Sequence, residues 1–389
     1  MFEPALNYDI LKSFTNDESV VQELALYTKN TFITGKYDQL KKLQLPDEKH
    51  IESWLFYKRE ASENGVYETL KKYLVQFNFP VKKGISQSTA YRTATLKGQS
   101  VEGMPEATGL DLKHPELLEL QIYQSPAGKV PVLIIPHERD FMTIVQALGW
   151  RNEPETLPPS MGASLVKGLN NWHRLRQLKE NWLMDNPEAN WMVYFQNKVL
   201  PNKSLYQDTL ILLSNKPYSA VHGLEWSLSA DMWAELSLKI RLEHECTHYF
   251  TLRFFGTMRN NMHDELIADY MGITKVLGTY NSSWFLRFIG LENYPLYRKG
   301  GRLENYLGQP ALSVASFSIL QQLLKRASDH VEAFDHSLGA PNTIPERIIR
   351  LLTLCNLTLE QMASENGVED LLFIYKKQTS FFRNLNMPK

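Results

Sequence analysis

Apolar residues recur every three or four positions through much of the N-terminal part of the chain, which is the spacing of one face of an α-helix. Three segments carry this pattern: DESVVQELALYTKNTF, EKHIESWLFYKREAS and YETLKKYLVQF. The first segment begins with acidic residues, which suit the start of a helix. We therefore predict a mainly helical N-terminal region over residues 1–115.

Runs rich in β-branched and aromatic residues follow in the middle of the chain. LELQIY and VPVLIIP are separated by QSPAGK, whose proline and glycine suit a hairpin turn between two strands. TAYRTATLKG, WMVYFQNKVL and DTLILLSN are also interpreted as strands. Residues 139–148 and NWHRLRQLKENWLM favour helices, and RNEPETLPPSMGASLVKG is interpreted as a loop or a boundary. This order predicts a small sheet with helices around it.

Helical patterns dominate from Ala230 to the end of the chain, interrupted by YRKGGRLENYLGQP and HSLGAPNTIP. SADMWAELSLKIRLEHECTHYFTLRFFG is expected to form one long helix without proline. Ser227 or Ser229 can cap its start, and Gly256 can end it. The sequence after residue 280 therefore predicts a helical C-terminal lobe.

Composition narrows the class of protein. The 389 residues are 43% hydrophobic, which is enough for a sizeable core, and 42 basic residues balance 43 acidic ones, which indicates no nucleic-acid partner. The only cysteines are Cys246 and Cys355, so a disulfide framework and a cysteine-rich zinc site are excluded. The chain starts without a secretory pattern and has no run of eighteen apolar residues. We expect a cytoplasmic protein without membrane contact.

The long predicted helix carries His244 and His248 four positions apart, with Glu245 between them. Residues at this spacing lie about 40° apart around the helix axis and roughly 6 Å apart along it, so both imidazoles can reach one metal ion. Glu245 lies about 100° from His244, where it can address a water molecule without binding the metal. HExxH patterns also arise by chance, so the residues that follow must show whether this one belongs to a metal site.

A third ligand is needed, because a catalytic zinc takes three protein ligands and leaves one position for water. HDELIADYMGITKVLG predicts a second helix after a short turn, with His263 or Asp264 at its cap and Gly278 at its end. Glu265 and Asp269 then share one face. Glu265 can complete the metal site while Asp269 accepts a hydrogen bond from a ligand histidine. His263 is the alternative third ligand.

An HExxH pattern followed on a second helix by glutamate, three residues and aspartate resembles the gluzincin group of zinc metallopeptidases. Thermolysin and the membrane-bound CAAX prenyl proteases belong to this group. The resemblance implies three zinc ligands, His244, His248 and Glu265. It implies Glu245 as the general base, and Asp264 and Asp269 as residues that orient the histidines.

The chain also departs from this pattern. Sixteen residues separate His248 from Glu265, a shorter link than in thermolysin, and Asp264 stands where thermolysin-like enzymes carry asparagine. PERIIRLL is similar to an element of the prenyl proteases, but the histidine that precedes its proline there is missing. The donor that stabilises the transition state stays open among Tyr270, His330, His336 and Arg347. The alternative to a metal site is a pair of ordinary histidines.

We therefore predict an α+β protein with a zincin-like catalytic region over residues 116–280, in which the HExxH helix lies beside a small mixed sheet. The helical N-terminal region (1–115) and the C-terminal lobe (281–389) flank it. The strand Thr209–Ser214 is expected beside the helix, offering its edge to an extended substrate.

The predicted function is a zinc-dependent hydrolase with one Zn²⁺ per chain, a metallopeptidase or amidase that acts on a peptide or small amide. Zinc would activate the attacking water, and Glu245 would accept its proton. The alternatives are a zinc enzyme with a non-peptide substrate and a non-catalytic regulatory protein on a zincin scaffold.

Overall fold

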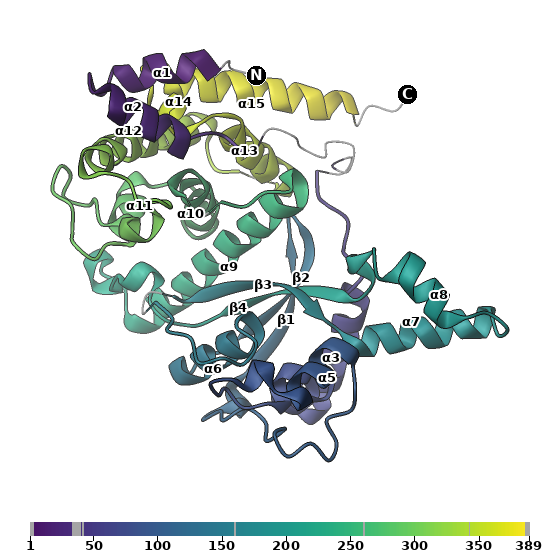
Figure 1. Cartoon of the computed structure of the whole chain (residues 1–389). Coiled ribbons are helices and arrows are strands. Elements are labelled where there is room, and N and C mark those ends of the chain that lie inside the picture. Colours follow the sequence, from purple (N-terminus) through teal and green to yellow (C-terminus); the bar gives the residue numbers. More distant parts are fainter. Residues whose placement is uncertain are drawn as a thin grey trace. The chain divides into compact units, whose positions relative to one another are not determined.

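The computed structural model describes residues 4–32, 40, 43–158, 161–259, 261–341 and 343–385. The chain forms two compact units (Figure 1). The sheet unit is Asp47–Lys216, and the helical unit combines Met1–Pro46 with Pro217–Lys389. These limits differ from the boundaries expected near residues 115 and 280, because contacts between the two ends of the chain define the helical unit.

The sheet unit is built on a mixed sheet of four strands in the order β1–β2–β4–β3. The strands are β1 (Glu119–Ser125), β2 (Gly128–Ile134), β3 (Ala163–Asn170) and β4 (Gln207–Leu213). β1 and β2 form the predicted antiparallel hairpin, β2 pairs with β4 in parallel, and β3 pairs with β4 antiparallel. The predicted α+β class with a small mixed sheet is confirmed.

Helices cover this sheet and bury its apolar side chains. α3 packs against β1 and β2, and α6 packs against β3 and β4. Their shared core includes Trp54, Phe141 and Leu212, and its burial is the main stabilising contribution to a layered unit of this kind. The α-helices described in the sheet unit are α3 (Ile51–Asn64), α4 (Val66–Tyr73), α5 (Thr89–Lys97), α6 (Glu138–Gly149), α7 (Trp172–Asp185) and α8 (Trp191–Tyr194).

Two of the predicted strands are helices. TAYRTATLKG forms α5, because the Ser88 side chain accepts a hydrogen bond from the Tyr91 amide and Gly98 ends the helix with a φ of 67°. WMVYFQNKVL begins as α8, capped by the Asn190 side chain, and continues as a π-helix over Phe195–Val199. Both runs are rich in residues with high strand propensity, but the capping interactions at their ends favour helix.

The predicted strand Thr209–Ser214 corresponds to β4, but its expected role as a substrate-binding edge is wrong. β4 lies inside the sheet, and both of its sides pair with neighbouring strands. One of them, β3, comes from the segment that was interpreted as a loop. The β3–β4 pairing is irregular between Lys167 and Leu169, where Gly168 has a φ of 70°. A glycine at such an irregularity obscures the strand pattern in the sequence.

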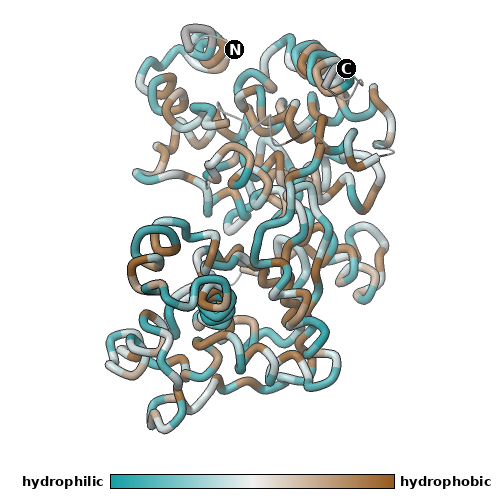
Figure 2. Tube along the Cα trace, turned by 90° about the vertical axis from the view of Figure 1, so that its right-hand side faces the viewer, coloured by the Kyte–Doolittle hydropathy of each residue, from teal (hydrophilic) through white to brown (hydrophobic). Residues whose placement is uncertain are grey.

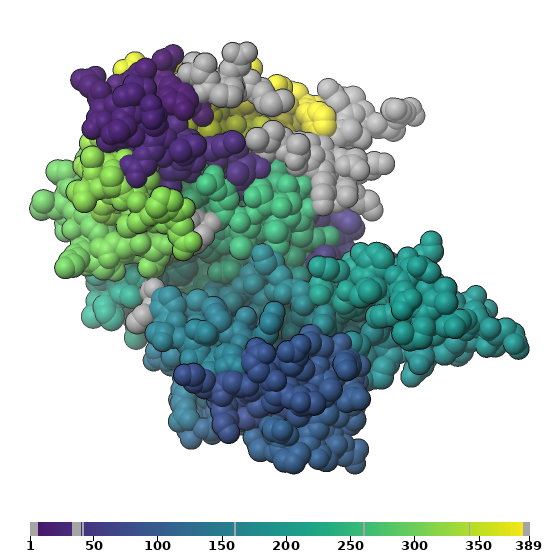
Figure 3. All heavy atoms as spheres, viewed as in Figure 1, coloured from purple at the N-terminus to yellow at the C-terminus, as the bar shows by residue number. Residues whose placement is uncertain are grey.

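The helical unit brings both ends of the chain together. α12 packs against α2, α11, α14 and α15, so the N-terminal helices lie beside the C-terminal ones (Figures 1 and 3). Figure 2 shows hydrophobic and hydrophilic residues interspersed along the chain, as expected where helices bury one face and expose the other. The α-helices described in this unit are α1 (Pro4–Lys12), α2 (Glu18–Tyr27), α9 (Ala230–Phe255), α10 (Met262–Leu277), α11 (Ser282–Ile289), α12 (Val314–Leu338), α13 (Ile344–Asn356), α14 (Leu359–Ala363) and α15 (Gly367–Leu385).

The predicted C-terminal lobe is helical, as α11 to α15 show. Among the described residues, none of the helices combines the length and the apolar character that a membrane crossing requires.

Candidate metal centre

Helix α9 carries the HExxH residues and packs closely on α10. The side chain of Ser229 accepts a hydrogen bond from the Met232 amide at its start, and Gly256 ends it with a φ of 76°, as predicted. At Gly272 of α10, an added Cβ atom would lie 2.8 Å from the backbone oxygen of Ile240 in α9. Only glycine therefore permits the observed distance between the two helices.

Helix α10 begins slightly earlier than the sequence suggested. Asn261 is its N-cap and accepts a hydrogen bond from the Asp264 amide, whereas His263 or Asp264 was predicted at this position. His263 therefore lies in the first turn, where it is buried and not solvated. Burial lowers the pKa of His263 to about 4. The ring of His263 packs against Phe32, and it is not among the residues that converge on the candidate site.

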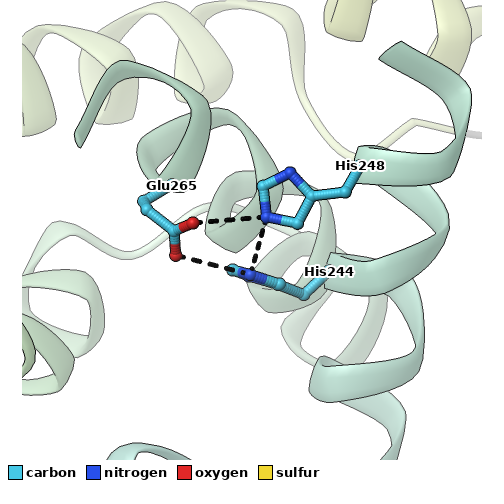
Figure 4. A group of neighbouring side chains, drawn as sticks. All are labelled: His244, His248 and Glu265. Atoms are coloured by element: carbon cyan, nitrogen blue, oxygen red, sulfur yellow. Dashed lines mark hydrogen bonds and ion pairs between the residues drawn. The ribbon is translucent and has the colours of Figure 1, made fainter. Parts of the chain in front are cut away.

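The side chains of His244, His248 and Glu265 point toward one another from α9 and α10 (Figure 4). The two Nε2 atoms are 3.0 Å apart. The Nε2 atom of His244 lies 3.4 Å from one Glu265 oxygen, and that of His248 lies 3.3 Å from the other. The three residues are only 6%, 7% and 3% exposed. The structure thus brings together the three predicted ligands in a group shielded from solvent.

This group could hold a metal ion. Its three ligand atoms lie within 4.8 Å of one another. Nitrogen and oxygen ligands bind zinc at roughly 2.0–2.2 Å, so the donors around one tetrahedral zinc are separated by roughly 3.3–3.6 Å. The two Nε2 atoms lie 3.0 Å apart, and those of His244 and His248 lie 3.4 and 3.3 Å from different oxygens of Glu265, which is close to this range. Oε2 of Glu265 is buried without a hydrogen-bond donor among the described residues, and a cation would satisfy it.

Charge coupling within the group is strong. Burial by itself lowers the pKa of His248, but the hydrogen bond and the charge of Glu265 outweigh it and raise this pKa to about 9. Burial raises the pKa of Glu265, but the charges of His244 and His248 lower it to about 2. A cation bound between the two histidines and Glu265 would replace the histidine proton as the positive partner of the Glu265 carboxylate.

Asp269 supports His244 from the side opposite Glu265. The Nδ1 atom of His244 donates a hydrogen bond of 2.8 Å to Asp269, which leaves Nε2 directed toward Glu265. Asp269 also accepts a 2.5 Å hydrogen bond from the Tyr218 hydroxyl and forms an ion pair with Arg302. Burial raises the pKa of Asp269, but the charge of Arg302 and the bond from His244 outweigh it and lower this pKa.

Asp264, the other predicted support, lies at the start of α10. Its carboxylate accepts a 2.6 Å hydrogen bond from the Arg259 amide, and its charge contributes to the raised pKa of His248. Burial raises the pKa of Asp264 itself to about 6. The described contacts of Asp264 thus join the turn to α10, and its influence on the histidines is electrostatic.

Glu245 is partly exposed, unlike the buried histidines on either side of it in HExxH. Its negative charge contributes to the raised pKa of His248. Burial lowers the pKa of Arg241, and the charge of Glu245 partly offsets this effect. Glu245 therefore lies close to the group and retains access to solvent.

The side chains considered as transition-state donors make their described contacts elsewhere. The Tyr270 hydroxyl donates to Asp335, the His330 ring contacts the Met362 carbonyl, and Arg347 pairs with Glu243. His336 is exposed near the end of α12. These contacts give the first three side chains structural roles.

Three residues near the group were missed by the sequence reasoning: Tyr218, Arg302 and Tyr306. Burial and the charge of Glu265 raise the pKa of Tyr306 well above its ordinary value, so Tyr306 lies near that carboxylate. Tyr218 belongs to the short helix η7 (Tyr218–Ala220), and the other two belong to η9 (Arg302–Tyr306). Their segments have no hydrophobic periodicity or motif, so no local signal identified them.

Comparison with known proteins was made for the whole chain. The family described as "Family of unknown function (DUF7005)" matches residues 9–366, which is most of the chain. No curated protein and no solved structure matches it. The chemistry of the candidate site therefore depends on its own geometry.

Proposed function

The chain belongs to the DUF7005 family, and we propose that it is a zinc-dependent hydrolase of amide bonds. The observation that carries the proposal is the convergence of His244, His248 and Glu265 within ligand distance of one another, beside a partly exposed glutamate of the same helix. The resemblance of the sequence pattern around these residues to that of the gluzincin peptidases supports a peptide or a small amide as the substrate.

Each residue has a distinct role in this proposal. When bound, a zinc ion acts as a Lewis acid that polarises a carbonyl group and lowers the pKa of water toward roughly 7. Glu245 takes the proton from the attacking water and delivers it to the leaving nitrogen. The bond to Asp269 keeps a proton on Nδ1 of His244, so that its Nε2 lone pair is available as a ligand.

A pair of variants on α9 tests this proposal. Glu245→Gln removes the proton acceptor but none of the three ligands, so we expect close to one zinc per chain and at least a ~100-fold loss of hydrolysis of a degenerate peptide library. Glu235→Gln is the control, because Glu235 is exposed and pairs only with Lys239 in the described contacts. The control should keep both zinc and turnover.

Two results would count against the proposal in different ways. If Glu245→Gln hydrolysed the library as the wild type does, its role as general base would be wrong. If the wild type held no stoichiometric transition metal after zinc reconstitution, the whole proposed function would be wrong.

A further inference from the structure

The carboxylate of Asp269 is buried completely and is contacted from three other elements of the helical unit. His244 of α9 and Tyr218 of η7 both contact Oδ1, and Arg302 of η9 contacts Oδ2. Arg302 also donates a 2.9 Å hydrogen bond to the Tyr218 hydroxyl. Arg302 therefore bridges the tyrosine and the aspartate with two different nitrogens.

We propose that Arg302 and Tyr218 form a clamp that fixes Asp269 and thereby positions the Nε2 atom of His244 for metal binding. We refer to these two residues as the Asp269 clamp. The inference rests on the proposed metal centre, and it assigns to Arg302 and Tyr218 a positioning role that no sequence motif indicated.

The hydrogen-bond directions give the clamp its geometry. The Tyr218 hydroxyl donates a 2.5 Å hydrogen bond to Oδ1 of Asp269. The same hydroxyl oxygen accepts from Arg302. Nδ1 of His244 lies 2.8 Å from Oδ1 of Asp269 and 2.9 Å from the Tyr218 oxygen, so Asp269 and Tyr218 together fix the tautomer and the orientation of this imidazole.

The charge of Arg302 makes the buried aspartate tolerable. A carboxylate with no exposure to water needs a cation and hydrogen bonds to remain ionised, and Asp269 receives both. A guanidinium group presents several N–H donors in a rigid fork, so it can bond Tyr218 and Asp269 together. The ammonium group of a lysine lacks this fixed geometry.

A tightly closed loop delivers Arg302 to this position. The Arg298 amide donates a 2.9 Å hydrogen bond to the Gly290 carbonyl, and the Tyr297 hydroxyl donates one of 2.8 Å to the Gly301 carbonyl. A Cβ atom at Gly301 would lie 2.8 Å from the Ile289 backbone oxygen. The backbone directly before Arg302 therefore has little freedom, as a positioning element requires.

Zinc affinity of the purified full-length chain, measured by competition with a chromophoric chelator, tests the clamp. We expect Arg302→Ala to weaken zinc binding about 10- to 100-fold, and Tyr218→Phe and Arg302→Lys about tenfold each, as is typical for residues that orient a metal ligand. Lys299→Ala is the matched control, because Lys299 is an exposed cation of the same loop. The control should bind zinc as the wild type does.

Two further readouts separate positioning from a general loss of structure. In an Asp269→Asn background, Arg302→Ala should weaken zinc binding by less than about threefold further, because both changes act through the same carboxylate. The absorption spectrum of the cobalt(II)-substituted protein should change in Arg302→Lys and Tyr218→Phe but not in Lys299→Ala. Circular dichroism of the metal-free variants checks that they are folded.

The outcomes are distinguishable. Wild-type zinc affinity in a folded Arg302→Ala variant would overturn the clamp, and so would an unreduced effect of Arg302→Ala in the Asp269→Asn background. If Arg302→Ala does not fold, unchanged affinity and cobalt spectra in both Arg302→Lys and Tyr218→Phe would overturn it. A wild type that binds no zinc would overturn the proposed function and the clamp together, whereas unchanged clamp variants of a zinc-binding wild type overturn the clamp alone.

Discussion

Gly272 lies where α10 approaches α9, and replacing it tests how the fold places the third ligand. A Cβ atom there would lie 2.8 Å from the backbone oxygen of Ile240 and 2.9 Å from its Cγ2 atom, whereas ordinary contacts begin at 3.4 Å. In Gly272→Ala the two helices must therefore separate by about 0.6 Å at this point, the difference between 3.4 and 2.8 Å. The backbone oxygen cannot rotate away as a flexible side chain can.

This movement reaches the candidate site directly. Glu265 precedes Gly272 on α10 by about two turns, and Ile240 precedes His244 on α9 by about one, so both pairs share a helix face. Metal sites require donor positions within about 0.2 Å. We expect Gly272→Ala to weaken zinc binding by about tenfold or more, because Glu265 moves away from the histidines.

Stability should change as well. Overpacking costs about 1–3 kcal/mol, and the higher helix propensity of alanine offsets up to about 1 kcal/mol of it. The free energy of unfolding of the metal-free protein, measured in urea, should fall by about 1–2 kcal/mol. Gly149→Ala in α6 is the control, because a Cβ atom there meets nothing within 4 Å. Wild-type zinc affinity together with wild-type stability in Gly272→Ala would refute the reasoning.

The remaining predictions concern single side chains. Glu265→Ala should no longer bind one zinc per chain, whereas His263→Ala should still bind it. Metal analysis that shows the opposite ranking would exclude Glu265 as the third ligand. Asp269→Ala should weaken zinc binding or turnover by roughly 10- to 100-fold with the site still assembled, and an unchanged affinity and rate would contradict its support of His244. Burial raises the pKa of Glu360 to about 7, so the free energy of unfolding should fall as pH rises from about 4.5 to 7. Glu360→Gln should flatten this dependence and stabilise the protein at pH 8 by up to about 3 kcal/mol, which urea denaturation at pH 5 and pH 8 measures.

Much of the candidate site could be predicted because its signals are local. The spacing of His244 and His248 fixes their common helix face, and Glu265 and Asp269 share a face for the same reason. Ser229 caps the start of α9 and Gly256 ends the helix, as the capping preferences of serine and glycine predict. Each of these features depends on residues within a few positions of one another, so it can be predicted from a single sequence.

The parts that escaped prediction depend on contacts between distant segments. Arg302 reaches Asp269 and Tyr218 only through the folded helical unit, and this unit joins both ends of the chain. The strand β3 was hidden by an irregular, glycine-containing pairing, and its position beside β4 removed the edge expected for a substrate. α5 formed where strand propensity was high, because its capping residues favoured a helix.

The central claim is that one zinc ion lies between α9 and α10. A crystal of the zinc-reconstituted protein, measured on both sides of the zinc absorption edge, tests this claim most directly. We predict one anomalous peak per chain among the Nε2 atoms of His244 and His248 and the carboxylate of Glu265, at roughly 2.0–2.2 Å from each. The absence of an anomalous peak among these three side chains in a fully reconstituted crystal would contradict the account.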